Sequence, residues 1–164
     1  MATTFEKAIH VLTDAGVEFV VIGGFSAILH GSAHATLDLD ILFSRGTDNF
    51  ARLTRALAPY HPRPDGFPEG LPFLWEEATL RNGTVFTLKT DLGRIDLMTE
   101  VSGLGSFSEI WEQSVEADLY GRRVRTLSLQ DLIKAKRAAG RVKDLQVLPE
   151  LESIQEALDQ KRSG

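Results

Sequence analysis

The sequence predicts an α/β fold in which helices pack on a mixed, largely antiparallel sheet. Three observations support this prediction. Short apolar runs alternate with helical segments in the first part of the chain, a β-meander pattern covers Phe73 to Met98, and a pair of helical stretches follows Leu127. With 164 residues, we expect a single domain spanning 1–164. Its core should lie at about residues 5–127, and its C-terminal helices at about residues 128–160.

The composition limits the classes of function. A hydrophobic content of 43% and a charged content of 25% are those of an ordinary soluble globular protein. No apolar run reaches the length of a membrane span and no signal-peptide pattern is present, so we expect a cytoplasmic protein without a membrane partner. The absence of cysteine excludes disulfides, thiolate catalysis and cysteine-based zinc sites.

The charge is unevenly distributed. The net charge of -5 argues against nucleic-acid binding over the whole surface. The stretch from Arg122 to Lys143, however, carries eight basic residues and one acidic residue, Asp131. This local excess predicts a surface that binds an anion.

The first elements follow from hydrophobic periodicity. Thr3–Thr13 is expected to be a helix, because Thr3 and Glu6 have the spacing of a capping box and an apolar stripe follows. Val17–Ile22 has the nearly continuous apolar character of an interior strand. Gly24–His30 is expected to be a short helix after a glycine turn.

A helix and a proline-rich segment come next. Thr47–Ala58 has a helical stripe, with Thr47 as the expected N-cap. Pro59–Pro72 contains five of the six prolines and is expected to be a loop. Two interpretations of this loop remain open: a mobile flap beside a functional site, or an ordinary surface connection.

The middle of the chain predicts strands. Asn82-Gly83 is a strong hairpin signal between Trp75–Leu80 and Val85–Thr90. A second turn, Asp91 to Gly93, leads into a strand over Arg94–Met98.

Helices and one hairpin complete the chain. The expected elements are a helix over Ser106–Val115, a hairpin over Ala117–Leu127 that turns at Tyr120-Gly121, a helix over Ser128–Ala139 with Ser128 as N-cap and Gly140 as stop, and a last helix over Arg141–Gln160 with a kink near Pro149.

Two carboxylates stand side by side in the strand that begins at Leu37. Strand side chains alternate, so Asp38 and Asp40 share one face while Leu37, Leu39 and Ile41 share the other. The two carboxylates are then roughly 7 Å apart along the strand. They repel each other unless a divalent cation lies between them. The pattern therefore predicts a metal site, with an exposed acidic strand face as the alternative.

The glycine turn before this strand suggests a phosphate site. Gly23-Gly24 opens a helix whose free backbone N–H groups suit a phosphate. A third acid, Asp96, has an apolar residue on each side. If its strand lies beside that of Asp38, three carboxylates converge and can bind two metal ions. This combination is typical of phosphoryl or nucleotidyl transfer.

These segments resemble a known superfamily. Ile22-Gly23-Gly24, followed by Asp38-Leu39-Asp40-Ile41 and then Ile95-Asp96-Leu97, is similar to the signature of the DNA polymerase beta-type nucleotidyltransferases. The segments 31–40 and 129–145 resemble the branch that includes small bacterial nucleotidyltransferases and AbiEii-type toxins. The similarity extends over about residues 5 to 150.

The resemblance implies roles for individual residues. Gly23, Gly24, Ser26 and Lys136 would bind the nucleotide phosphates. Asp38, Asp40 and Asp96 would be catalytic and would bind Mg²⁺ or Mn²⁺, with Asp96 also acting on the acceptor hydroxyl. The supporting residues would be His34, Thr36, Arg141 and Asp144.

One position departs from the family pattern. Many relatives carry arginine where this chain has His34, two residues before Thr36. A histidine is mostly neutral near pH 7, so one fixed positive charge is absent.

The expected activity is transfer of a nucleoside monophosphate from a nucleoside triphosphate to a hydroxyl, with release of pyrophosphate. The acceptor could be a tRNA 3′ end, a protein side chain or a small molecule such as an antibiotic. The alternatives are a non-catalytic, antitoxin-like module that binds a toxin partner, and a nucleotide sensor that binds without turnover.

Overall fold

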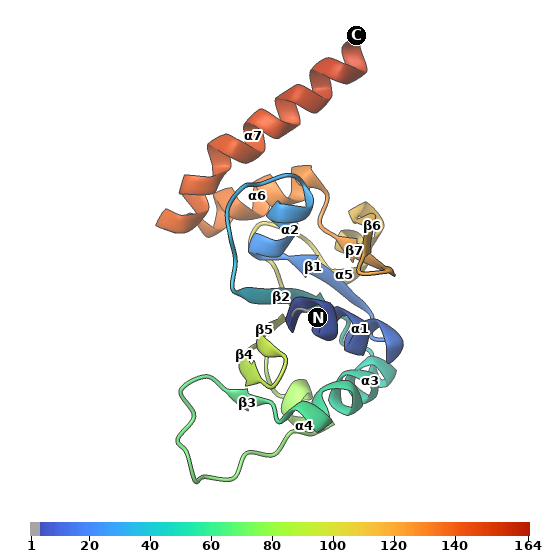
Figure 1. Cartoon of the computed structure of the whole chain (residues 1–164), viewed down its shortest axis with the longest axis vertical. Coiled ribbons are helices and arrows are strands. Elements are labelled where there is room, and N and C mark those ends of the chain that lie inside the picture. Colours follow the sequence, from blue (N-terminus) through green and yellow to red (C-terminus); the bar gives the residue numbers. More distant parts are fainter. Residues whose placement is uncertain (1–3) are drawn as a thin grey trace.

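The computed structural model describes residues 4–164, which form one seven-stranded sheet with helices on both faces (Figure 1). The strands are β1 Phe19–Ile22, β2 Asp38–Phe43, β3 Arg63–Pro64, β4 Val85–Thr90, β5 Gly93–Met98, β6 Val115–Leu119 and β7 Arg122–Thr126. The helices are α1 Thr4–Asp14, α2 Gly23–Leu29, α3 Thr47–Leu57, α4 Glu77–Arg81, α5 Phe107–Gln113, α6 Leu129–Ala139 and α7 Val142–Ser163, with a 3-10 turn, η1, at Ala58–Tyr60.

The strand order is β3-β4-β5-β2-β1-β7-β6. Pairs β1–β7 and β2–β5 are parallel, and the other neighbouring pairs are antiparallel. The prediction of a mixed, largely antiparallel sheet is therefore confirmed. Strands β2 and β5, which carry the predicted acids, lie inside the sheet and are hydrogen-bonded on both sides.

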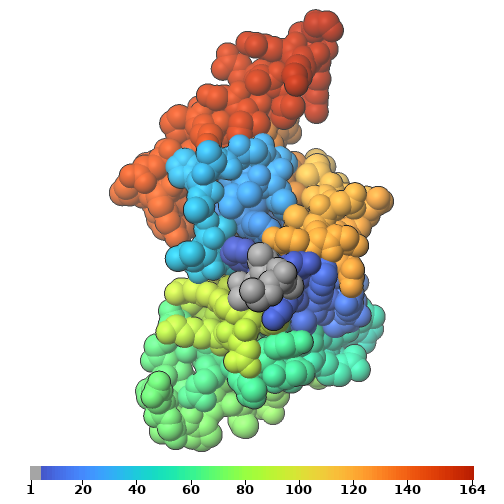
Figure 2. Space-filling model, viewed as in Figure 1, coloured from blue at the N-terminus to red at the C-terminus, as the bar shows by residue number. Residues whose placement is uncertain are grey.

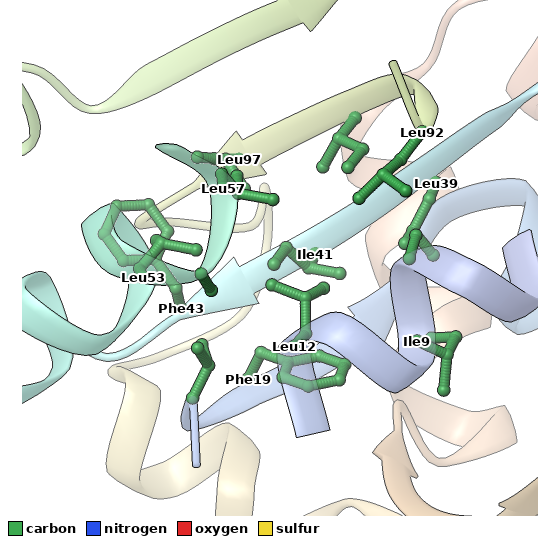
Figure 3. Packing of buried hydrophobic residues seen from close by; sticks show 14 of the residues in the cluster. Ile9, Leu12, Phe19, Leu39, Ile41, Phe43, Leu53, Leu57, Leu92 and Leu97 are labelled. Atoms are coloured by element: carbon green, nitrogen blue, oxygen red, sulfur yellow. The ribbon is translucent and has the colours of Figure 1, made fainter. Parts of the chain in front are cut away.

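The hydrophobic core has two parts, one on each face of the sheet. Strands β1 and β2 supply side chains alternately to the two faces. Helices α1 and α3 cover the first face, where Leu39, Ile41 and Phe43 of β2 pack against Leu12 and Leu53 (Figure 3). Helices α6 and α7 cover the second face, which contains Leu42 and Ile22. Asp38 and Asp40 alternate with Leu39 and Ile41, so they face the side of α6 and α7.

Most predicted elements are confirmed, with boundaries that differ by a few residues. Ser128 caps α6 by accepting a hydrogen bond from the backbone N–H of Asp131, and Gly140 ends the helix at a φ of 65°. Tyr120-Gly121 turns the β6–β7 hairpin. Helix α7 continues through Pro149. Thr3, expected in the first capping box, lies outside the described residues.

The predicted strand at Trp75–Leu80 is wrong, because residues 77–81 form helix α4. Glu77, Leu80 and Arg81 are good helix formers, and Leu80 is fully buried. Asn82 ends this helix instead of turning a hairpin, and β4 pairs with β3 and β5. The Asn82-Gly83 signal marks the end of a helix and not a hairpin, because the preceding segment packs Leu80 into the core.

Three smaller expectations are also corrected. Gly46, not Thr47, occupies the N-cap of α3. The proline-rich loop contains the short strand β3. Leu37 lies before β2 and is 90% exposed, so it does not share the buried face of Leu39.

The molecule is elongated. The second half of α7 projects from the body at one end, and the loop between β3 and α4 extends at the other (Figures 1 and 2). Among the described residues, no helix combines the length and the apolar character that crossing a bilayer requires.

Candidate active site

The parallel pairing of β2 with β5 brings the three predicted acids together. In the register of this pair, Asp38 lies opposite Arg94 and Asp40 lies opposite Asp96. Residues opposite each other on neighbouring strands point to the same face. Asp38, Asp40, Arg94 and Asp96 therefore form one polar patch, which we call the carboxylate patch. The condition set by the sequence, that the strand of Asp96 lie beside that of Asp38, is met.

The backbone at Gly23 lies very close to the side chain of Asp40. A Cβ atom at position 23 would lie 2.3 Å from Oδ2 of Asp40, which is closer than any real contact. Gly23 also has a φ of +67°, a conformation that glycine adopts without strain. The backbone of Gly23 is thus in direct contact with the Asp40 side chain, and no larger residue fits at position 23. No side chain caps the start of α2, so its first N–H groups remain available to a ligand.

Burial dominates the electrostatics of the carboxylate patch. It raises the pKa of Asp40 to about 7, and the nearby charge of Asp96 adds to this effect. Burial also raises the pKa of Asp96, although Asp40 and Arg94 partly oppose this by hydrogen bonding and charge. Oδ1 of Asp40 and Oδ1 of Asp96 are buried and have no hydrogen-bond partner in the part of the chain that the structure describes. Buried acceptors without donors are costly, so both atoms are suited to a cation.

The donor set fits a hard divalent cation such as Mg²⁺, which prefers carboxylate oxygens. Among the described residues, however, no group of three or more His, Cys, Asp or Glu side chains has the arrangement of a preformed metal site. One reason is visible at the patch. The guanidinium of Arg94 lies between two of the acids, with Nε 3.6 Å from Oδ2 of Asp38 and 3.6 Å from Oδ1 of Asp96.

A buried acid organises the basic end of the site. Asp144 of α7 is fully buried, and its carboxylate accepts hydrogen bonds from Nζ of Lys136 at 3.2 Å and from Nε of Arg141 at 2.7 Å. Burial alone would raise the pKa of Asp144, but these partners hold it below its ordinary value. Asp144 therefore fixes Lys136, whose positive charge also opposes the raised pKa of Asp40.

The loop between α2 and β2 is attached to α7. Glu150 accepts hydrogen bonds from the hydroxyl of Ser32 and from the backbone N–H of Ala33, and it lies 3.1 Å from Nδ1 of His34. Thr36, farther along this loop, packs against Gly24. A Cβ atom at position 24 would lie 3.2 Å from Oγ1 of Thr36.

A cavity of about 1310 Å³ opens beside the carboxylate patch. The predicted site residues that line it are Gly23, Gly24, His34, Thr36, Asp38, Asp40, Lys136, Arg141 and Asp144. Its apolar wall includes Met98, Val101, Leu104 and Phe107. Asp96 does not line the cavity and lies behind it, next to Asp40.

Ser26 is a predicted site residue that, like Asp96, does not line the cavity. It is fully buried, and its hydroxyl lies 2.6 Å from that of Thr126 on β7. This hydroxyl joins α2 to the sheet, and the geometry gives it no path to a phosphate.

Sequence reasoning missed two residues, Arg94 and Glu150. Arg94 could have been found, because it precedes Asp96 by two positions and strand alternation places both on one face. Glu150 gave no signal, since its contact with the loop depends on how α7 packs.

The chain is similar to solved structures of nucleotidyltransferases over more than nine tenths of its length. The lincosamide antibiotic adenylyltransferase LnuA, bound to lincomycin, matches with a TM-score of 0.61 and 16% identity over 92% of this chain and 96% of that chain. A proposed nucleotidyltransferase from Thermotoga maritima matches with a TM-score of 0.59 and 16% identity over 91% and 92%. ANT(2'')-Ia in complex with adenylyl-2''-tobramycin matches with a TM-score of 0.54 and 15% identity over 98% and 99%.

Sequence comparisons add nothing to these similarities: no protein-family model and no curated protein sequence matches the chain. The expected membership of the AbiEii-type branch stays a prediction. The solved structures do agree on the arrangement of the whole chain, and they are similar over nearly all of their own length. The chain therefore has the same fold as these nucleotidyltransferases.

Proposed function

We propose that the chain is an Mg²⁺-dependent nucleotidyltransferase that moves a nucleoside monophosphate from a nucleoside triphosphate to a hydroxyl group of a small molecule. One observation carries this proposal. The β2–β5 register sets Asp40 beside Asp96, with Gly23 against Asp40, at the wall of a large cavity in this fold.

The phosphates of the nucleotide would lie between the glycine turn and α6. Gly23 and Gly24 line the cavity next to Asp40, and Lys136 faces them from α6. Backbone N–H groups and an ammonium group are suitable partners for phosphate oxygens. Ser26 is not part of this proposed site, because its hydroxyl is buried against Thr126.

The metal would be held by Asp38, Asp40 and Asp96, and when bound it would neutralise phosphate charge and favour ionisation of the acceptor hydroxyl. The acceptor oxygen forms a bond to the α-phosphorus as the bond from that phosphorus to the β-phosphate oxygen breaks. Pyrophosphate leaves with the electrons of the broken bond. Asp96, which lies next to Asp40 at the patch, would accept the hydroxyl proton.

The size of the cavity supports a small-molecule acceptor. Typical small-molecule sites measure roughly 300–1,000 Å³. The cavity here is larger, at about 1310 Å³, and so has room for a nucleotide and a second compound together. Two proteins that share its fold, LnuA and ANT(2'')-Ia, have antibiotic compounds bound in their solved structures. RNA, including tRNA, and protein remain the other acceptor classes to test.

The test is a transfer screen with the full chain. Each nucleoside triphosphate, labelled at the α-phosphate, is incubated with Mg²⁺ or Mn²⁺ and with lincosamides, aminoglycosides, total tRNA or a protein extract. We expect labelled product and pyrophosphate with one acceptor class. Asp40→Asn should reduce the rate by at least about 10³-fold, because a metal ligand is lost. Asp118→Asn, which makes the same change at an exposed position, should keep full activity.

Two results would count against the proposal. Transfer that persists in Asp40→Asn would place the chemistry elsewhere. Nucleotide binding without product for every acceptor would instead favour the sensor or antitoxin-like alternative, and a stable complex with a toxin chain would distinguish the latter.

A further inference from the structure

Arg94 occupies the centre of the carboxylate patch, and the proposed function gives it no role. Its Nε lies 3.6 Å from a carboxylate oxygen of Asp38 and 3.6 Å from one of Asp96. These distances allow charge neutralisation but exceed those of a good hydrogen bond, about 2.7–3.2 Å. The same Nε is buried and has no hydrogen-bond partner. Arg94 is therefore attracted to both acids without being bound tightly by either.

The other end of the guanidinium is held firmly. Nη1 of Arg94 donates a hydrogen bond of 2.8 Å to Oδ2 of Asp65. Asp65 follows β3 in the proline-rich segment, and its backbone N–H donates to the carbonyl of Thr87 at 2.8 Å. Its second carboxylate oxygen lies 3.2 Å from Nζ of Lys89. Asp65 thus provides an anchored partner for Arg94 outside the patch.

A cation suits the carboxylate patch. Asp38, Asp40 and Asp96 bring three carboxyl groups together on one face of the sheet. Without a metal ion, Arg94 is the cation placed between Asp38 and Asp96. A divalent cation on these oxygens would meet the guanidinium at the same place, and two positive charges at this separation repel.

We propose that Arg94 is a tethered counter-ion: it neutralises Asp38 and Asp96 in the metal-free protein, gives way to a divalent cation, and is then retained by Asp65. Arg94 is thus a positioning residue that lowers the affinity of the patch for metal and keeps the acids in place until metal arrives. The inference rests on the metal site of the proposed function but not on catalysis.

The test measures the affinity of the full chain for Mn²⁺ in the absence of nucleotide. The electron paramagnetic resonance signal of free Mn²⁺ decreases as the ion binds to the protein. Arg94→Gln should bind Mn²⁺ more tightly by at least about fivefold, the lower end of typical coupling between sites. Asp65→Asn should bind it more weakly, because the guanidinium then remains with Asp38 and Asp96. A purely structural role of Arg94 would weaken binding in both variants.

Arg123→Gln is the matched control. It makes the same substitution at an exposed residue of β7 whose ion pairs are with Glu116 and Asp118, away from the carboxylate patch. An increase in Mn²⁺ affinity as large as that of Arg94→Gln would mean that the loss of any positive charge explains the effect, and it would overturn the inference. Equal affinity of wild type, Arg94→Gln and Asp65→Asn would also overturn it, as would the absence of Mn²⁺ binding in all of them.

Thermal unfolding is a second measurement, which tests the inference even if Arg94→Gln is less stable than wild type. The thermal unfolding midpoint of this variant should rise more on addition of Mn²⁺ than that of wild type, because its acids have lost their internal cation. Asp65→Asn changes a partly exposed side chain and gives the opposite expectation for affinity. If these shifts occur and no transfer activity is found, the proposed function fails while the inference stands.

Discussion

Gly23 and Asp40 are in contact in the folded chain, so even the methyl group of an alanine at position 23 should disturb the site. Gly23→Ala places a methyl group within 2.3 Å of the Asp40 carboxylate and forces alanine to a φ of +67°. We expect activity to fall by roughly 100-fold, as for a displacement of about 1 Å at a catalytic group. Stability should fall by about 1–3 kcal/mol. Kinetics and urea unfolding measure the two effects.

Gly121→Ala separates strain from displacement. Gly121 has a φ of +77°, and a Cβ there would meet nothing within 4 Å. This variant should lose stability but keep its activity. Equal loss of activity in both variants would mean that backbone strain, and not contact with Asp40, explains the result.

The raised pKa of Asp40 predicts how stability depends on pH. Its pKa is about 7 in the folded chain and 3.8 when unperturbed, so the folded state binds the proton more tightly. This contribution to stability is fully present below about pH 4 and is lost as the pH rises through about 7. It amounts to no more than roughly 4 kcal/mol, and Asp96, shifted in the same direction, adds to the trend.

Urea unfolding between pH 5 and pH 8 in the presence of a chelator tests this expectation. Relative to Asp40→Asn, which cannot ionise at this position, wild type should lose stability as the pH rises. Asp118→Asn should show the wild-type trend. A pH dependence that is the same in wild type and Asp40→Asn would show that Asp40 ionises normally.

At the scale of elements, helix α7 supports the loop that lines the cavity. Glu150 contacts Ser32, Ala33 and His34, and hydrogen bonding from Ser32 lowers its pKa. Glu150→Ala should therefore loosen the loop, and the KM for nucleotide should rise severalfold while kcat changes little. Hydrogen exchange at the backbone of Ala33 and His34 should become faster.

Glu156→Ala is the control for this prediction, because Glu156 is on the exposed part of the same helix. It should change neither the loop nor the KM. An unchanged exchange rate at Ala33 in Glu150→Ala would show that the loop holds its shape without α7.

Only part of the candidate site could be predicted from the sequence. Asp38, Asp40 and Gly23 were predictable because strand alternation and glycine chemistry are local rules. The meeting of Asp40 with Asp96 depends on the β2–β5 register, which connects distant segments, so the residues alone predicted it only as a condition. The role of Arg94 was harder still, because it depends on Asp65 from a loop without periodicity.

The errors have the same origin. Glu77–Arg81 became a helix because Leu80 packs into the core, an interaction that outweighs a strong turn dipeptide. Ser26 has the sequence context of a phosphate ligand, but its rotation on α2 directs the hydroxyl to Thr126. Neither the packing of a five-residue helix nor the rotation of a short one can be obtained from one sequence.

At the scale of the whole molecule, the central position of the acids gives the candidate site its rigidity. Strands β2 and β5 have hydrogen-bonded neighbours on both sides, and Leu39, Ile41, Ile95 and Leu97 are fully buried behind the carboxylate patch. Arg94 lies among the acids, and residues 34–36 line the cavity beside them. The arrangement suits a site whose ligands stay in place while its proposed counter-ion moves.

The free half of α7 has a practical consequence for handling the protein. Every residue from 156 to 163 is exposed, and this segment stands clear of the body (Figure 2). A rod attached to a globule diffuses more slowly than a sphere of equal mass. A single chain should consequently leave a gel-filtration column earlier than globular standards of 18.1 kDa, and its mass is better obtained by light scattering.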